Sequence, residues 1–258
     1  MILRFVSAVN VVAFMWLMLG GICTMVIADT MTVIVQSATD PILPERRCRI
    51  MTINYISNAW VRLKNHCRTT VNKGFTSNEP STDFKRKLLL SEHSPIRLLE
   101  IDWSWLNVPY WCAMEWARHR FEKFITSQRD DRMIDDTPRG KKPQDAPVRY
   151  DGYANAQNTI DAWRKRLCYQ ATPEARKLAE QFKEELREHE PEWSDVLVPN
   201  CVYRCGCPEF SMCKERFFAR FCKYCEENQV NIKNIQERYK AYNDFYYYEK
   251  EIAENEKL

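Results

Sequence analysis

Three segments of the chain carry apolar residues at the spacing of an α-helix. They run over Thr82 to Leu90, over Ala154 to Cys168, and onward from Thr172, where Thr-Pro-Glu is a typical helix start. Residues that recur every three or four positions lie on one side of a helix, so each segment predicts an amphipathic helix. The buried stripes would carry Phe84, Leu88 and Leu89, then Ala156, Ile160, Trp163 and Leu167, then Ala175, Leu178, Ala179, Phe182 and Leu186.

Period-two alternation, which is typical of a half-buried strand, runs from Ile96 to Asn107. Its core-facing side would carry Leu99, Ile101, Trp103 and Trp105. The segment from Asp135 to Asp151 is rich in Pro, Asp and Lys, so it predicts a loop or a mobile flap. Shorter elements are predicted as a strand at Thr52 to Ser57, helices at Trp60 to Cys67 and from Pro109 to about Arg118, and a Tyr-rich helix that ends at Leu258.

The N-terminal fifty residues differ from the rest of the chain. Phe5 to Ala28 is an almost uncharged apolar run that is long enough to span a bilayer or to serve as a secretory signal. A third alternative is a later start, at Met31 or Met51. We therefore expect residues 1–50 to be an extension, residues 51–213 a catalytic domain and residues 214–258 a helical extension. A membrane partner is expected only if residues 5–28 are retained.

Composition limits the function classes. The formal net charge of +3 gives no bulk reason to expect nucleic acid as a partner, so an anion site must come from local clustering. With six glycines and no glycine-rich phosphate loop, a nucleotide would be held mainly by side chains. Eleven cysteines without a regular framework indicate reduced thiols or a metal site, and hence a cytoplasmic protein.

Arginines gather in residues 118–132, directly after an aromatic segment that contains Trp111 and Trp116. The guanidinium group stays charged and presents a fork of N–H donors, so arginines in this number suit a ligand with several phosphates. A solvated basic face is the alternative, but the preceding residues are apolar rather than of mixed charge.

Three separated motifs resemble those of the flavin-dependent thymidylate synthases, the ThyX family, and in particular its divergent phage-type members. The first is His93-Ser94-Pro95, and the second is Arg118-His119-Arg120 followed by Ser127-Gln128-Arg129. The third is Asn155-Ala156-Gln157 with Arg166 nine residues later, and Arg139 lies roughly where the family has a further arginine.

The resemblance implies an α+β fold with an antiparallel sheet core flanked by helices, assembled as a homotetramer. It implies an enzyme that binds FAD, dUMP, methylenetetrahydrofolate and NADPH. Such an enzyme methylates dUMP at C5, takes its hydride from reduced flavin, and would act in the cytoplasm of a bacterium or of a phage-infected host.

Site residues follow from the same resemblance. The catalytic residue would be Arg166, which would polarise the pyrimidine. The FAD contacts would be Ser94, Arg118, His119, Arg120, Asn155, Gln157 and Gln170. The dUMP contacts would be Glu115, Arg118, Ser127, Gln128, Arg129, Arg139 and Arg166.

Two alternatives stay open. Glu115 stands where the family usually has glutamine, and a carboxylate accepts hydrogen bonds without donating them, which suggests a related reaction such as hydroxymethylation or a dCMP substrate. The other alternative is a non-catalytic RNA- or DNA-binding protein, because arginines interleaved with aromatics suit nucleic acid as well. We expect no nucleic acid, because the arginines concentrate at motif positions instead of spreading along one face.

A cysteine cluster follows the predicted catalytic helices. Four thiolates at Cys168, Cys201, Cys207 and Cys213 would form a structural zinc site, although they lack the usual Cys-x-x-Cys knuckle. Cys222 and Cys225 do have that spacing, but in a predicted helix. Buried free thiols are the alternative to zinc for both groups.

Overall fold

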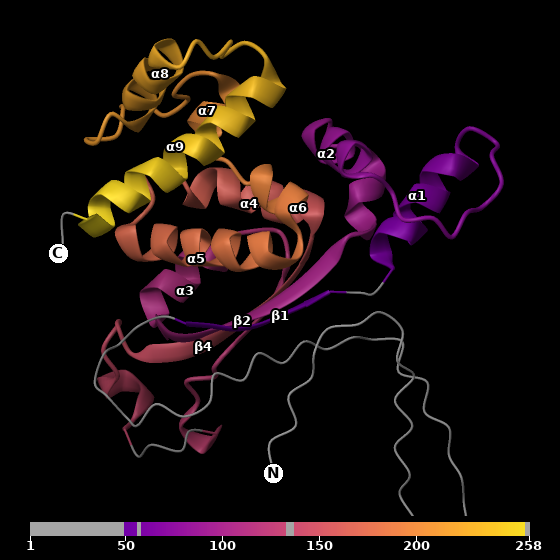
Figure 1. Ribbon diagram of the computed structural model, residues 1–258. Coiled ribbons are helices and arrows are strands. Elements are labelled where there is room, and N and C mark those ends of the chain that lie inside the picture. Colours follow the sequence, from indigo (N-terminus) through magenta and orange to yellow (C-terminus); the bar gives the residue numbers. More distant parts are fainter. Residues whose placement is uncertain (1–48, 56–57, 133–136, 256–258) are drawn as a thin grey trace, which may run out of the picture.

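A four-stranded antiparallel sheet, in the order β1-β2-β4-β3, is the centre of the fold (Figure 1). The computed structural model describes residues 49–55, 58–132 and 137–255. The apolar segment 5–28 and almost all of the expected N-terminal extension lie outside these residues. The strands are β1 (Arg49–Tyr55), β2 (Glu100–Pro109), β3 (Glu122–Ile125) and β4 (Pro147–Asn155).

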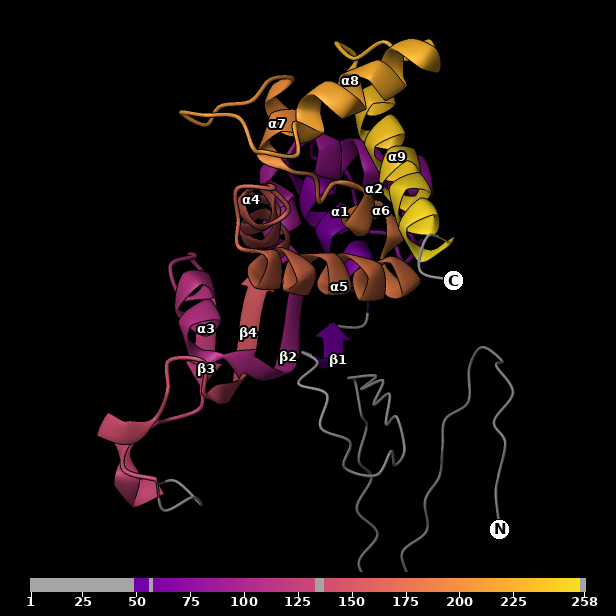
Figure 2. The same cartoon turned by 90° about the vertical axis from the view of Figure 1, so that its left-hand side faces the viewer.

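Helices cover one face of this sheet, so the predicted α+β class with an antiparallel core is confirmed (Figures 1 and 2). Within the described part of the chain, no helix is long and apolar enough to cross a membrane. The α-helices are α1 (Ala59–Thr69), α2 (Thr82–Leu90), α3 (Tyr110–Trp116), α4 (Ala156–Arg166), α5 (Pro173–His189), α6 (Pro191–Asp195), α7 (Asn200–Arg204), α8 (Phe217–Glu227) and α9 (Ile235–Asn255). The described residues also form the short 3₁₀ helices η1 (Ser94–Leu98), η2 (Asp130–Arg132) and η3 (Arg139–Lys141).

β2 confirms the alternation read from the sequence, with one correction at its start. Leu99, Ile101, Trp103 and Trp105 are all buried. The strand begins at Glu100 rather than Ile96, because residues 94–98 form η1. Pro95, whose ring fixes φ near the helical value, lies in the first turn of η1 and favours the helical start.

The prediction for residues 135–155 was wrong at its end. β4 occupies residues 147–155, which had been divided between a loop and the start of a helix. Its buried residues Val148, Tyr150, Gly152 and Ala154 alternate with more exposed ones, which is the period of a strand. Asn155 sets the true helix start, since its side-chain Oδ1 accepts a hydrogen bond from the Asn158 N–H at 3.0 Å. The short strand β3 was not predicted.

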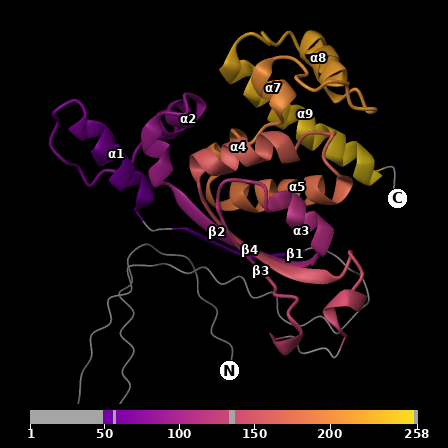
Figure 3. The ribbon, with the colours of Figure 1, turned by 180° about the vertical axis from the view of Figure 1, so that it is seen from behind.

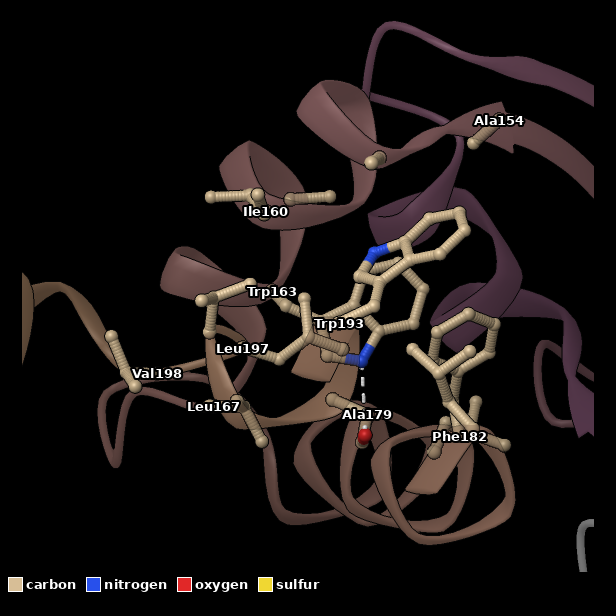
Figure 4. Packing of buried hydrophobic residues seen from close by; sticks show 14 of the residues in the cluster. Ala154, Ile160, Trp163, Leu167, Ala179, Phe182, Trp193, Leu197 and Val198 are labelled. Atoms are coloured by element: carbon tan, nitrogen blue, oxygen red, sulfur yellow. Dashed lines mark hydrogen bonds between the residues drawn. The ribbon is translucent and has the colours of Figure 1, made fainter. Parts of the chain in front are cut away.

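Aromatic rings fill the layer between the sheet and the helices. Trp103 packs edge-on against Trp163 and Phe182, with ring centroids 5.7 and 5.1 Å apart. The indole N–H of Trp163 donates to the carbonyl of Ala179 at 3.0 Å (Figure 4). Gly152 is required beneath Trp103, because a Cβ at that position would lie 2.2 Å from the Trp103 ring.

The C-terminal helices pack onto the same core. Buried Arg238 of α9 donates to the carbonyl oxygens of Val202 (2.7 Å) and Tyr203 (3.1 Å), and buried Lys183 of α5 donates to Asn243 of α9 at 2.8 Å. Figure 3 shows α9 lying across the helical layer above α5. The expected division at residue 213 stays a prediction.

Residues 126–132 and 137–146, between β3 and β4, extend away from the body of the protein and are called the arm here (Figures 2 and 3). The arm carries η2 and η3, and its described residues are mostly exposed. This segment therefore has little core of its own.

Candidate functional site

A cleft of about 510 Å³ opens where β2, β3, β4 and α4 meet, and we call it the sheet-end cleft. It lies at the start of β2, at the end of β4, on the turn before β3 and on the first turn of α4. Small-molecule sites typically enclose about 300–1,000 Å³, so this volume suits a nucleotide-sized ligand. The lining residues are Glu100, Arg120, Phe121, Glu122, Lys123, Tyr153, Ala154, Asn155 and Asn158.

Positive charge at the cleft comes from Arg120 and from the start of α4. Among the described residues, the exposed Arg120 guanidinium makes no hydrogen bond or ion pair. Lys123 differs, since its Nζ donates to the backbone oxygens of His119 (2.8 Å) and Phe121 (3.1 Å) and so fixes the turn that carries Arg120. The N-terminal end of an α-helix carries a partial positive charge, which adds to that of Arg120.

The same cleft also holds acidic and aromatic groups. Glu100 and Glu122 line the cleft together with Arg120 and Lys123, and Phe121 and Tyr153 add ring surfaces. Partial burial and a hydrogen bond with Glu100 raise the pKa of Tyr153. Because the charges are mixed, the cleft suits a compact ligand with both phosphate and ring parts better than a long nucleic-acid backbone.

A second group of predicted site residues forms a network at the other end of α4. Arg166 donates from Nε to His119 Nε2 at 2.8 Å, from one terminal nitrogen to the Glu115 backbone oxygen at 2.6 Å, and from the other to Glu115 Oε2 at 3.3 Å. The Thr172 hydroxyl donates to the same carboxylate oxygen at 3.0 Å. Three of the five N–H groups of Arg166 therefore point to protein atoms.

Burial keeps His119 uncharged in this network. Desolvation, followed by the charges of Arg166 and Lys123, lowers its pKa to about 4. Its Nε2 accepts the hydrogen bond from Arg166, which a protonated imidazole could not do. Burial also lowers the pKa of Arg166, with Arg118 adding to the effect, but an arginine stays charged over the working pH range. The exposed Arg118 lies close enough to this network for its charge to act on Arg166.

Gln157 and Ser94 lie near a third cluster, around Glu92. The Gln157 amide donates to Glu92 Oε2 at 2.7 Å, and Arg164 forms an ion pair with the same carboxylate. Ser94 is exposed at the start of η1. The amide of Gln157 thus has a partner within the chain.

The arm carries the remaining predicted dUMP contacts. Arg129 forms a two-pronged ion pair with Asp131, with N–O distances of 2.9 and 2.7 Å. The Ser127 hydroxyl accepts the Arg129 backbone N–H at 3.3 Å, and the Arg139 backbone N–H donates to Asp130 at 2.6 Å. Gln128 is half-buried. These residues are grouped with one another, but they do not line the sheet-end cleft.

Gln170 lies elsewhere, at a small cavity lined by the four candidate zinc ligands. Its amide donates to the Ser211 backbone oxygen at 2.9 Å. Of the predicted FAD contacts, the sheet-end cleft therefore contains Arg120 and Asn155.

Several cleft residues were missed by the sequence analysis. Lys123, Tyr153 and Asn158 line the cleft beside the predicted Arg120 and Asn155. The alternation in residues 147–155 was the available signal, because a strand there brings Tyr153 beside Asn155 at the end of the sheet.

No family model matches this sequence, and no curated protein matches it. Among the solved structures that resemble part of the fold are two of the flavin-dependent thymidylate synthase ThyX from Helicobacter pylori with FAD and dUMP. The first has a TM-score of 0.47 and 12% identity, and the match covers 58% of this chain and 99% of that one. The second has a TM-score of 0.45 and 14% identity, and covers 57% and 100%. Likeness at this level says nothing about the chemistry of this chain.

Proposed function

We propose that this chain is a flavin-dependent thymidylate synthase that binds FAD and methylates dUMP at C5. Methylenetetrahydrofolate would supply the carbon and NADPH would reduce the flavin. The observation that carries the proposal is that Arg120 and Asn155, which belong to two separate motifs, line one cleft of about 510 Å³. The antiparallel pairing of β3 with β4, in which Glu122 lies opposite Tyr153, brings the two motifs together at this cleft.

The cleft residues fit a phosphate-bearing ligand with a ring system. The Arg120 guanidinium makes no hydrogen bond or ion pair with the described residues, and a guanidinium can bind phosphate oxygens through paired hydrogen bonds. The Asn155 oxygen is committed to capping α4, so its amide nitrogen is the group that would donate to a ligand. Bound flavin would supply hydride transfer, which no side chain can perform.

The chain positions these groups without using their ligand-facing atoms. Lys123 holds the backbone of the turn on both sides of Arg120. Asn155 lies where β4 passes into α4, so its orientation is set by the sheet and by the helix together. The Asn155 amide is therefore held in place before a ligand binds, which reduces the entropy lost on binding.

One copy of the chain divides the predicted residues between distant places. Asn155 and Arg166 lie at opposite ends of α4, about 16 Å apart at 1.5 Å per residue. The dUMP candidates Ser127 and Arg129 lie on the arm, outside the cleft. We propose that the arm of a second copy completes the site, as in the homotetramer that the resemblance implies.

Turnover tests the reaction directly. Full-length protein, reconstituted with FAD, should convert dUMP to dTMP in the presence of methylenetetrahydrofolate and NADPH. Arg120→Gln should lose most of this activity, whereas Arg86→Gln, a matched exposed arginine on α2, should keep it. No dTMP from the FAD-loaded protein would contradict the proposal, and product from dCMP instead would favour the alternative substrate.

Subunit mixing tests the shared site. Arg120→Gln and Arg129→Gln variants, each inactive alone, should regain activity when their subunits are exchanged, because mixed assemblies contain some intact pairs. Light scattering should report a homotetramer for each parent. A mixture that exchanges subunits and stays inactive would place both residues in the same copy's site or outside it.

A further inference from the structure

We propose that Cys168, Cys201, Cys207 and Cys213 bind one structural zinc ion that fastens the loop between α7 and α8 to the end of α4. This site is separate from the sheet-end cleft and does not depend on the proposed reaction. Cys168 follows α4, Cys201 lies in α7, and the other two lie in the irregular loop of residues 205–216.

All four cysteines line one cavity of about 20 Å³. About 10–15 Å³ of such volume holds one water molecule, so this cavity has room for a single ion but not for an iron–sulfur cluster. Tetrahedral sites made of four thiolates are typical of zinc. The chain separates Cys168 from Cys213 by more than forty positions, so their convergence comes from the fold and not from a local repeat.

The four sulfur atoms have to move toward one another to bind the ion. Among the described residues, the sets of three or more metal-binding side chains with ligand atoms within 4.8 Å of one another do not include these cysteines. Sulfur atoms around zinc lie about 2.3 Å from the metal. Metal binding would therefore draw Cys207 and Cys213, which are on the loop, toward Cys168, which follows α4, and Cys201, which lies in α7.

One backbone contact favours a thiolate at Cys213. The backbone N–H of Phe217, at the start of the 11-residue helix α8, donates to the Cys213 sulfur at 3.4 Å. A helix N-terminus stabilises a nearby anion, so this sulfur is suited to bind a metal as the thiolate.

The loop needs such a fastening, because its large apolar side chains are not buried. Phe210 and Met212 are both exposed, at 112% and 65%, and residues 205–216 contain no helix or strand. Without buried apolar area, a loop of this length loses more conformational entropy than its contacts return. A metal that joins two loop residues to two helices would offset that loss.

Two other groups are weaker candidates. Glu185, Glu188 and His189 bring their ligand atoms within 4.8 Å of one another, but they lie along one helix at the surface. Cys222 and Cys225 have the Cys-x-x-Cys spacing, and both lie within α8. Neither group encloses a cavity with four sulfur donors.

Metal analysis of the full-length protein, purified without chelators, tests the proposal. We expect close to one zinc per chain. Cys207→Ser and Cys213→Ser should bind zinc more weakly by at least the roughly 10- to 100-fold that losing even an outer partner costs. Cys222→Ser, in the competing pair, and Cys67→Ser, on α1, should keep their zinc.

A second measurement guards against variants that fail to fold. In the unmodified protein, a thiol reagent should release zinc to a chromophoric chelator, and the cobalt(II)-substituted protein should show the visible absorption of tetrahedral thiolate ligation. Protein that binds no zinc on reconstitution, or zinc that Cys207→Ser retains and Cys222→Ser loses, would overturn the assignment. An iron-loaded protein, or a disulfide between any two of the four cysteines, would overturn it as well.

Discussion

The two ends of α4 differ in whether their polar groups already have partners. At the first end, Asn155 and Asn158 face a cleft of about 510 Å³ together with Arg120, which has no ion pair among the described residues. At the other end, Arg166 is held by Glu115 and His119, and Cys168 lines a cavity of about 20 Å³. Polar groups with partners hold a structure together, whereas those without partners are available to a ligand.

The difference also separates two uses of arginine. Arg164 and Arg166 are mostly buried and paired with carboxylates, so removing either leaves an unpaired charge inside the protein. Arg120 is exposed at the mouth of a cleft, so its removal costs little folding energy. Substitution of Arg164 or Arg166 should therefore lower stability, whereas substitution of Arg120 should lower ligand affinity and leave stability nearly unchanged.

The largest effect on stability is expected at the C-terminal end of α4, where Arg166 lies. Arg166→Met should lower the free energy of unfolding by about 3–5 kcal/mol, because it leaves the Glu115 carboxylate half-buried without its cation. Urea denaturation measures the loss. Adding Glu115→Gln to Arg166→Met should recover part of it, and a double variant no more stable than the single one would contradict the pairing.

A smaller effect is expected at the cleft, where substitution of Arg120 should change the free energy of ligand binding and not that of unfolding. Arg120→Gln should weaken FAD binding by about 1.5–3 kcal/mol, roughly 10- to 100-fold, which is typical of a hydrogen bond to a charged group. Its free energy of unfolding should stay within about 0.5 kcal/mol of the parent. A variant that loses stability but binds FAD normally would reverse the comparison.

Asn155 should contribute to both stability and ligand binding, because it caps α4 and lines the cleft. Asn155→Ala should cost about 1 kcal/mol of stability through the lost cap, and it should weaken ligand binding as well. Asn155→Asp keeps a capping oxygen but loses the amide donor, so it should restore stability and not affinity. Thermal denaturation and FAD titration of both variants separate the two roles. Equal affinity in Asn155→Asp and the parent would argue against an amide donor to the ligand.

The smallest effect is a change in the titration of one histidine. His119 has a folded pKa of about 4, below its ordinary value of 6.5, so the unfolded chain binds the proton more readily. Its contribution to stability is complete above about pH 6.5 and is lost as the pH falls toward 4. NMR titration of the His119 imidazole should give a pKa of about 4, and Arg166→Met should move this pKa upward. An unshifted His119 would mean that the network is open in solution.

The periodicity of apolar residues predicted the buried helix faces better than it predicted the cleft. The buried face of α5 was predicted correctly, because its apolar residues Ala175, Leu178, Ala179, Phe182 and Leu186 repeat at helical spacing. β4 was missed because Arg149, Asp151 and Asn155 give it a polar composition that resembles a loop. The ion pair of Glu115 with Arg166 spans 51 positions, and no local pattern indicates which distant charges meet.

The motif residues were placed by resemblance and not by any local rule. Arg120 and Asn155 do meet in one cleft, but Gln170 lies at the cysteine cavity and Arg129 on the arm. A spacing in sequence fixes the order of such residues, whereas strand pairing and the direction of each turn decide which of them share a pocket. The cysteines show the same limit, since their gathering at one cavity depends on how α4, α7 and the loop pack.

Titration of FAD into the full-length protein, followed by flavin fluorescence, tests the central claim most directly. The cleft should bind FAD in the parent and in Arg86→Gln, and roughly 10- to 100-fold more weakly in Arg120→Gln, with all three proteins equally stable. FAD binding that is absent from the parent, or unchanged in Arg120→Gln, would contradict the assignment of the sheet-end cleft.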